Sequence, residues 1–130
     1  VEDIVLAKIH KKYPLASKLE GKVKPYDIYI PELNIYIEVK SDKKSQETGN
    51  IVIEIEMYNK PSGLNSTKSD IWIIYTGTEF IYITPNRIWE CVSRNMLAPV
   101  KFIGRGDDQP KKAYLVKIDQ LKQYKTKGVF

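Results

Sequence analysis

The sequence predicts an α/β protein with a mixed central β-sheet flanked by helices. Short runs rich in Ile, Val and Tyr recur at strand length, and helical patterns precede and interrupt them. The chain has 130 residues, of which 42% are hydrophobic and 11% aromatic. This composition describes a globular chain with enough apolar surface for one core. We therefore expect a single domain over residues 1–130.

The first third of the chain predicts a helix followed by a β-hairpin. Residues 2–12 carry an imperfect apolar stripe, and Tyr13-Pro14 ends it because proline cannot continue a helix. A loop is expected over 15–24. Two runs of β-branched and aromatic residues, 26–30 and 35–40, then flank the turn signal Pro-Glu-Leu-Asn.

The remainder predicts further strands and two helical segments. Residues 41–50 contain no apolar side chain and predict an exposed loop, and 51–57 alternate strictly and predict a third strand of a meander. Gly77-Thr78 should join two strands in a hairpin. Thr84 and Pro85 are typical of a helix N-terminus, with Cys91 on the buried face. The remaining predicted elements are strands 71–76, 80–83, 102–103 and 113–118, a helix from 85 to about Asn95, and a last helical turn capped by Asp119.

Three charged residues stand out in the predicted hairpin. Asp27 lies on the first strand, and Glu38 and Lys40 share one face of the second because residues two apart on a strand point the same way. If Ile30 pairs with Ile35, Asp27 lies opposite Glu38. A solvated strand face could also carry Glu and Lys, but two carboxylates in an apolar hairpin are costly without a cation. Such oxygen ligands suit Mg²⁺ or Mn²⁺.

This constellation resembles the PD-(D/E)XK nuclease superfamily, which has the restriction-endonuclease-like fold. The resemblance implies that Asp27 and Glu38 are metal ligands and that Asp27, Glu38 and Lys40 are catalytic. One departure is that Tyr26 precedes Asp27, where the family motif has proline; Pro25 stands one position earlier. A helix, a three-strand meander and then mixed strands and helix is the order that such a nuclease core would show.

Four other glutamates compete for an accessory role in the predicted site. Glu54 and Glu56 share a face of the third predicted strand, and Glu54 is preferred because it lies deeper in that strand. Relatives in the superfamily often aim a glutamate from the first helix into the site, which makes Glu2 a candidate and Glu20 its competitor. All four could instead be surface residues.

The segment 58–70 is rich in Gly, Pro, Ser and Asn and ends at a strand. It resembles a segment of small phage-type nucleases, in which a Ser-Gly-Leu turn leads into a Thr-Lys-Ala/Ser-Asp element. Hydroxyl, amide and lysine groups suit contacts to phosphate oxygens, although the segment could be an ordinary connection in which Asp70 closes a turn. The expected DNA contacts are Lys43, Lys44, Lys60, Ser62 and Lys68, with Arg105, Lys111 and Lys112 available at a hairpin tip over 104–112.

Charge and composition limit the classes of partner that the protein is expected to bind. The 21 Lys and Arg residues against 16 Asp and Glu give a net charge of +5, which favours a polyanion such as double-stranded or branched DNA. The single cysteine excludes an internal disulfide and a cysteine-based metal centre, and suggests an intracellular protein. No apolar run reaches the roughly twenty residues that span a bilayer, so no membrane partner is expected. The resemblance suggests a phage- or virus-encoded chain.

The sequence therefore predicts a Mg²⁺- or Mn²⁺-dependent DNA endonuclease that forms a homodimer or higher homo-oligomer, because one active site cuts one strand. A site-specific enzyme of the homing or phage type is the first expectation, from the Ser-Gly-Leu segment. A Holliday-junction resolvase is the alternative within the same chemistry. A DNA-binding module with a vestigial nuclease motif is the alternative from another class.

Overall fold

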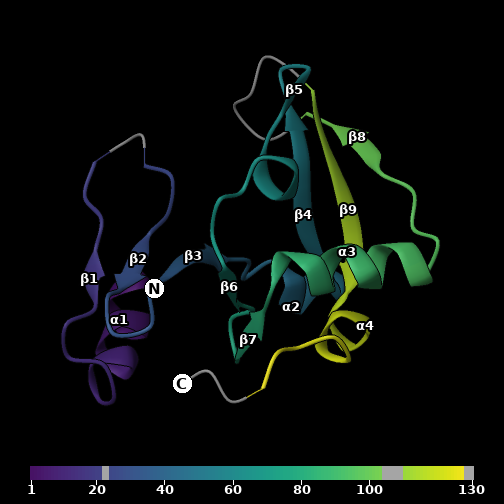
Figure 1. The fold of residues 1–130 in the computed structure, drawn as a ribbon. Coiled ribbons are helices and arrows are strands. Elements are labelled where there is room, and N and C mark those ends of the chain that lie inside the picture. Colours follow the sequence, from purple (N-terminus) through teal and green to yellow (C-terminus); the bar gives the residue numbers. More distant parts are fainter. Residues whose placement is uncertain (22–23, 104–109, 128–130) are drawn as a thin grey trace.

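Two β-sheets, rather than one central sheet, organise the chain (Figure 1). The computed structural model describes residues 1–21, 24–103 and 110–127. Its first sheet is mixed and has the strand order β1-β2-β3-β6-β7, and its second is antiparallel with the order β5-β4-β9-β8. The α/β class is thus confirmed, and the single central sheet is not.

The helices are α1 (Glu2–His10), α2 (Ser45–Thr48), α3 (Pro85–Arg94) and α4 (Ile118–Lys122), with a 3₁₀ turn η1 (Gly63–Asn65). The strands of the first sheet are β1 (Ser17–Lys18), β2 (Ile28–Ile30), β3 (Ile35–Ser41), β6 (Ile71–Tyr75) and β7 (Phe80–Ile83). Those of the second are β4 (Asn50–Met57), β5 (Lys60–Pro61), β8 (Val100–Phe102) and β9 (Lys111–Lys117).

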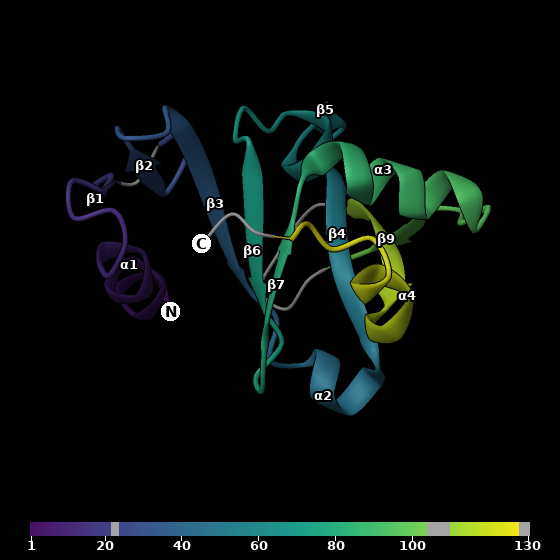
Figure 2. The same cartoon turned by 60° about the horizontal axis from the view of Figure 1, so that its bottom comes forward.

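The two faces of the first sheet pack against different layers (Figure 2). Ile28, Ile37 and Ile73 face helix α1 and form a core with its buried Val5 and Ile9. The opposite face is covered at β6 and β7 by the second sheet and by α3 and α4. That core contains Ile51, Ile53, Trp72, Ile74, Ile83, Ile88 and Val116. Because strand residues alternate between faces, β6 and β7 contribute to both layers, whereas the apolar residues of β3 belong to the α1 side.

Several local predictions are confirmed. Thr84 caps α3 by accepting a hydrogen bond from the Arg87 amide through Oγ1 at 3.2 Å, and Pro85 is the first helical residue. The buried residues of α3 are Ile88, Cys91 and Val92, as its pattern predicts. β6 and β7 form the expected antiparallel hairpin.

The predicted three-strand meander is wrong. β3 pairs in parallel with β6, and β4 pairs with β9 and β5 in the other sheet. The alternation of 51–57 is real, with Ile51 and Ile53 buried, but alternation sets which residues face inward and not which strand lies alongside. A parallel pair requires a crossover connection, and residues 42–70 provide it.

Three smaller expectations are also wrong. The segment 41–50 contains α2, where Ser45 is fully buried and its hydroxyl donates to the carbonyls of Asp42 and Thr76 at 2.6 and 3.1 Å. Strand β1 lies inside the predicted loop 15–24 because its backbone pairs with β2. Asp119 is within the first turn of α4, which begins after Lys117. Part of the predicted hairpin tip 104–112, including Arg105, falls outside the described residues.

Candidate active site

The β2–β3 hairpin has the predicted register. Ile30 pairs with Ile35 and Ile28 with Ile37, and Asn34 turns the chain with a φ of 52°. Asp27, one residue before β2, therefore lies opposite Glu38. Its amide donates to the carbonyl of Ile37 at 2.9 Å.

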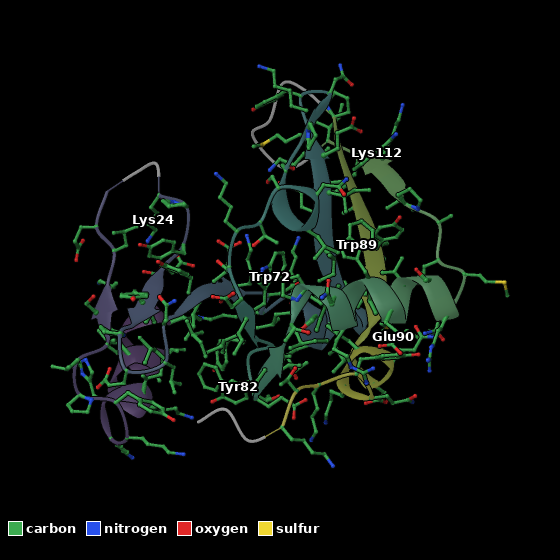
Figure 3. The ribbon with its side chains drawn as sticks, viewed as in Figure 1. Lys24, Trp72, Tyr82, Trp89, Glu90 and Lys112 are labelled. Atoms are coloured by element: carbon green, nitrogen blue, oxygen red, sulfur yellow. The ribbon has the colours of Figure 1, made fainter. Side chains whose placement is uncertain are left out.

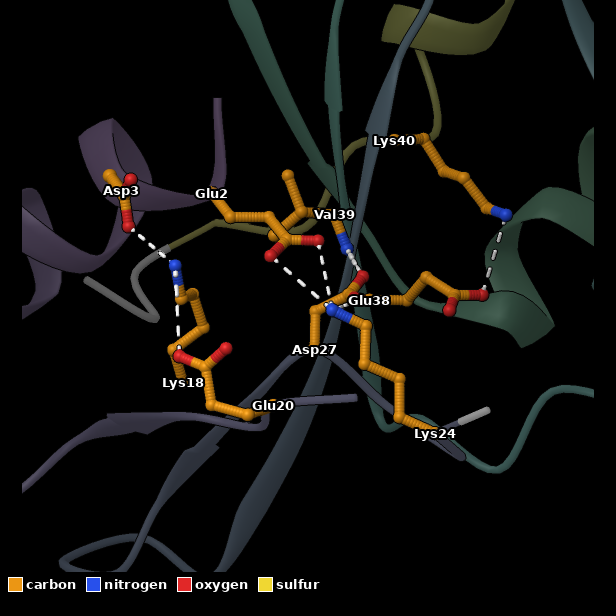
Figure 4. A network of polar contacts seen from close by, with 9 residues as sticks. All are labelled: Glu2, Asp3, Lys18, Glu20, Lys24, Asp27, Glu38, Val39 and Lys40. Carbon is orange, nitrogen blue, oxygen red and sulfur yellow. Dashed lines mark hydrogen bonds and ion pairs between the residues drawn. The ribbon is translucent and has the colours of Figure 1, made fainter. Parts of the chain in front are cut away.

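Asp27 is held against β3 through its side chain as well. Its Oδ2 accepts a hydrogen bond of 2.7 Å from the amide of Val39 (Figure 4), and the residue is only 7% exposed. A carboxylate that accepts a backbone N–H is oriented rather than free. The backbone of β3 thus fixes the Asp27 carboxylate beside that strand.

Glu38 and Lys40 project from one face of β3, while Ile37 and Val39 belong to the core cluster on the α1 side. The Lys40 Nζ lies 3.7 Å from Glu38 Oε2 and 5.3 Å from the ring centroid of Trp72. Trp72 is the neighbour of Glu38 in the parallel β3–β6 pair, and it is buried between the two sheets (Figure 3). The ammonium of Lys40 is thus placed by a carboxylate and an indole face.

Burial is the main influence on Glu38. Desolvation raises the pKa of its carboxyl above the ordinary value, and the negative charge of Asp27 raises it further. The ammonium of Lys40 acts in the opposite direction but does not cancel these effects. A half-buried glutamate that resists ionisation gains from a cation placed beside it, which is a property expected of a metal ligand.

Lys24 was not predicted, and it completes the charged cluster. Its Nζ lies 3.1 Å from Asp27 Oδ1 and 3.3 Å from Glu2 Oε1 (Figure 4). The hydrogen bond to Asp27 raises the pKa of Lys24. Glu2 is thus connected to Asp27 through Lys24, and its accessory role stays a prediction. Lys24 follows no periodic pattern, and its spacing of three residues from Asp27 was the only sequence signal.

Glu20 does not belong to this cluster. Its side chain is 84% exposed, and its nearest described cation is the Lys18 Nζ at 4.0 Å. Lys18 itself contacts Asp3 at 2.9 Å and holds the pKa of that carboxyl below its usual value. Asp3 and Lys18 line a different cavity, with Glu2, Val39 and Ser41, and Glu38 is not part of its lining.

A polar cavity of about 330 Å³ opens beside Glu38 and Lys40. Residues from both sheets and from the connection between them line it. They are Lys24, Pro25, Glu38, Lys40, Glu54, Met57, Ser62, Gly63, Ser66, Thr67 and Lys68. Of the predicted site residues, Glu38, Lys40, Glu54, Ser62 and Lys68 therefore meet in one place, although they are spread over thirty-one positions of the sequence from 38 to 68.

Glu54 faces the cavity and Glu56 does not. Glu54 accepts a hydrogen bond from the Ser62 hydroxyl at 2.8 Å and lies 3.6 Å from the Lys111 Nζ. Glu56 forms an ion pair with Lys112 at 3.5 Å. A β-bulge between the two positions shifts the pairing of β4 with β9 and gives the two glutamates different neighbours.

The segment 58–70 is anchored to β4 and β3, so part of its composition is structural. Tyr58 and Asn59 form the two-residue connection between β4 and β5, both with positive φ. The amides of Ser62 and Asn65 donate to the Ile55 carbonyl, through the backbone and the side chain respectively. Asp70 accepts from the Tyr36 amide at 2.8 Å. Asp70 therefore ties the segment to β3, as a connecting segment would.

The other predicted DNA contacts lie apart from this cavity. Lys43 and Lys44 precede α2 and are exposed, and Lys44 lines a separate, mainly apolar cavity of about 300 Å³. Lys40 also lines this second cavity. Lys60 is exposed on the short strand β5. Lys60, Lys43 and Lys44 are thus outside the cavity at Glu38, whereas Lys68 lines it.

The donor set for a metal is two carboxylates. Within residues 1–21, 24–103 and 110–127, no group of three or more His, Cys, Asp or Glu side chains is arranged to hold a metal ion. Asp27 and Glu38 supply oxygen ligands on one face of the hairpin, and hard cations take carboxylates completed by water. The ammonium of Lys24 already lies against Asp27, which shows that this position attracts positive charge. The chemistry of the pair fits Mg²⁺ or Mn²⁺ provided that Lys24 moves aside.

No family model, curated protein or solved structure matches this chain. Among the helices of the described residues, none has the length and apolar character needed to cross a membrane.

Proposed function

We propose that this protein is a Mg²⁺-dependent endodeoxyribonuclease that hydrolyses phosphodiester bonds in DNA. The observation that carries the proposal is the convergence of Glu38 and Lys40 on the rim of a polar cavity, with Asp27 fixed beside Glu38. Two carboxylates and an ammonium on one face of the hairpin match the needs of metal-assisted phosphate chemistry. Two further lysines, Lys24 and Lys68, line the same cavity.

Asp27 and Glu38 would hold the metal. When bound, Mg²⁺ polarises a phosphoryl oxygen and lowers the pKa of a bound water. The Val39 amide already orients the Asp27 carboxylate. Metal binding would therefore require little movement of that carboxylate. Desolvation opposes the ionisation of Glu38 in the free protein. A cation bound at this position would therefore stabilise its charged form.

Lys40 would stabilise the negative charge that develops on the phosphate. A donor set in place before the reaction needs little reorganisation, and this is the source of most electrostatic catalysis. The contacts of Lys40 with Glu38 and the Trp72 ring define where its ammonium lies. Lys40 is the more exposed partner of the ion pair, with 45% of its side chain accessible against 20% for Glu38, so its ammonium can be reached by a substrate phosphate.

Glu54, Ser62 and Lys68 form the opposite wall of the cavity. The hydrogen bond between Ser62 and Glu54 positions the start of the turn at Gly63, and Lys68 adds a positive charge for a flanking phosphate. Because one active site cuts one strand, cleavage of both strands of a duplex calls for two chains. We therefore propose that the protein acts as a homodimer.

The deciding experiment incubates the protein with supercoiled plasmid and with a synthetic four-way junction, each with Mg²⁺ or with EDTA. We expect nicking or linearisation in Mg²⁺ and none in EDTA. Strong preference for one duplex sequence would identify a site-specific endonuclease. Preference for the junction over its linear arms would identify a resolvase. Binding without cleavage in both Mg²⁺ and Mn²⁺ would contradict the nuclease proposal and leave a DNA-binding module.

A further inference from the structure

Three tyrosines form a contiguous aromatic row next to the candidate active site. The ring centroids of Tyr26 and Tyr36 are 4.4 Å apart, and those of Tyr36 and Tyr29 are 4.7 Å apart with an interplanar angle of 25°. Tyr26 and Tyr29 are separated by 6.5 Å. Tyr36 is thus the middle ring of the row. None of the three belongs to the main apolar clusters found among the described residues.

The row lies on the sheet face that carries Glu38 and Lys40. Tyr29 and Tyr36 are directly paired across β2 and β3, and paired residues share a face. Tyr36, Glu38 and Lys40 alternate along β3 with Ile37 and Val39, which face α1. The other strands of this face, β6 and β7, are covered by the second sheet through Trp72, Ile74, Ile81 and Ile83.

The tyrosines retain accessible surface. All three are half-buried, and the Tyr29 hydroxyl donates to the side chain of Asn34 at the exposed turn at 2.9 Å. An aromatic ring with one accessible surface can stack on a nucleobase, and this contact does not depend on base identity because every base has a π-face. Duplex DNA keeps its bases stacked inside the helix, so a stacking row serves unpaired bases only.

Positive charge and distance link the row to the cavity. Lys24 and Pro25 line the cavity, and Tyr26 follows them directly. Tyr36 and Glu38 are two residues apart on a strand, or about 7 Å. That separation is close to the rise of two stacked nucleotides, at about 3.4 Å each. A base stacked on this row would therefore bring a neighbouring backbone phosphate within reach of Glu38 and Lys40.

We propose that Tyr26, Tyr29 and Tyr36 form a stacking platform for unpaired DNA bases, and that the substrate has single-stranded nucleotides next to the scissile phosphate. The identification of DNA as the ligand rests on the proposed nuclease function. The platform itself is a binding surface, so it can be tested in EDTA without any cleavage.

The test measures fluorescence anisotropy of labelled oligonucleotides of twelve nucleotides in EDTA. The probes are oligo(dT), the oligo(dA)·oligo(dT) duplex and oligo(U). We expect wild type to bind oligo(dT) more tightly than the duplex. Tyr36→Leu keeps apolar bulk but removes the ring, and it should weaken oligo(dT) binding by about 5- to 100-fold while duplex affinity changes less than twofold.

Matched variants separate stacking from folding. Tyr36→Phe keeps the ring and should bind oligo(dT) within twofold of wild type. If circular dichroism shows that Tyr36→Leu is unfolded, Tyr26→Leu takes its place in the test, because Tyr26 lies outside the strands. Equal losses on single strand and duplex, or no loss in either leucine variant, would overturn the platform. Tighter binding of oligo(U) than of oligo(dT) would overturn the assignment to DNA.

The two proposals fail in different ways. If oligo(dT) binding depends on the rings but no DNA is cut in Mg²⁺ or Mn²⁺, the platform stands and the nuclease proposal falls. If plasmid is cut and the leucine variants bind oligo(dT) like wild type, the nuclease proposal stands and the platform falls.

Discussion

Strands β3 and β4 come from different sheets, yet each contributes one glutamate and the two face the same cavity. The side chains of Glu38 and Glu54 are 20% and 29% exposed, and each has a lysine ammonium at 3.7 and 3.6 Å respectively. They differ in their second neighbour. Glu38 has another carboxylate, Asp27, which raises its pKa further, whereas Glu54 accepts a hydrogen bond from Ser62.

The comparison shows that residue type and burial alone do not determine the chemical role of a glutamate. Burial keeps the pKa of Glu38 raised although Lys40 lies beside it, so a further cation would stabilise its charged form. Glu54, in contrast, accepts a hydrogen bond from Ser62 and pairs with Lys111. In the proposed site, the metal would therefore bind at Glu38, and Glu54 would have a supporting role through its hydrogen bond to Ser62.

The largest expected effect tests this assignment directly. Asp27→Ala and Glu38→Ala should each abolish Mg²⁺-dependent cleavage while DNA binding in EDTA survives, because each removes a proposed metal ligand. Glu54→Gln should slow cleavage by only about 10- to 100-fold. Initial rates on supercoiled plasmid measure both. Mg²⁺-dependent cutting retained in Glu38→Ala would contradict the assignment of Glu38.

The next effect concerns the lysine that accompanies Glu38. Lys40→Ala should slow cleavage by about 10²- to 10³-fold, with Mn²⁺ affinity little changed, because it removes a charge that acts on the phosphate and leaves both carboxylates in place. Single-turnover rates and Mn²⁺ titration measure the two quantities. Lys11→Ala is the control, since Lys11 is exposed at the end of α1. Cleavage by Lys40→Ala at the wild-type rate would reduce Lys40 to a surface residue.

The supporting role of the Glu54 wall predicts a stability effect at Gly63. A Cβ at this position would overlap the carbonyl oxygen of Glu54 and lie 2.9 Å from its carbonyl carbon, and φ is +51°. Gly63→Ala should lower the free energy of unfolding by about 3 kcal/mol. Gly49→Ala is the matched control, since φ is +76° but nothing lies within 4 Å of the added Cβ. Its cost should be about 1 kcal/mol, as measured by urea denaturation. Equal costs would contradict the close approach of the turn to β4.

DNA affinity should depend on Lys60 and Lys68, which belong to the segment 58–70 that follows β4. Replacing both with alanine should weaken affinity for every DNA sequence alike. The slope of log affinity against log salt should become flatter by about one for each phosphate that the variant no longer neutralises. Anisotropy titrations at several salt concentrations give this slope. If affinity and slope stay unchanged, the segment 58–70 is a connector only.

The smallest effect is a pH-dependent difference in stability. Glu38 has a raised pKa in the folded protein, so its ionisation opposes folding as pH rises above the ordinary value of 4.5. Glu38→Gln removes this opposition. The variant should melt at a higher temperature than wild type at pH 7, and the difference should vanish below pH 4.5. A difference that is independent of pH would show that the amide acts through packing instead.

The hairpin and its charged residues could be predicted because the information is local. The turn signal at 31–34 and the alternation of 35–40 fix both the register and the face of Glu38 and Lys40. The N-cap at Thr84 and the buried Cys91 follow from similar short-range rules.

The sequence could not reveal which residues become neighbours when segments distant along the chain pack together. β4 looked like a third strand of the first sheet because its alternation carries no information about its partner, and it pairs with β9, some sixty residues away. Lys24 was missed because it reaches Glu2 and Asp27 from an irregular segment. The tyrosine row joins positions 26, 29 and 36, and their contact depends on the turn as much as on the strands.

The parallel pairing of β3 with β6 has a consequence for the order of folding. The β2–β3 hairpin needs only a short loop to close, so Asp27 and Glu38 can meet early. Residues 42–70 must then leave for the second sheet and return before Ile37 pairs with Ile71. The same excursion delivers Glu54, Ser62 and Lys68 to the cavity. A nascent chain therefore holds its two carboxylates together before the cavity beside them has formed, so the proposed active site is complete only in the fully folded protein.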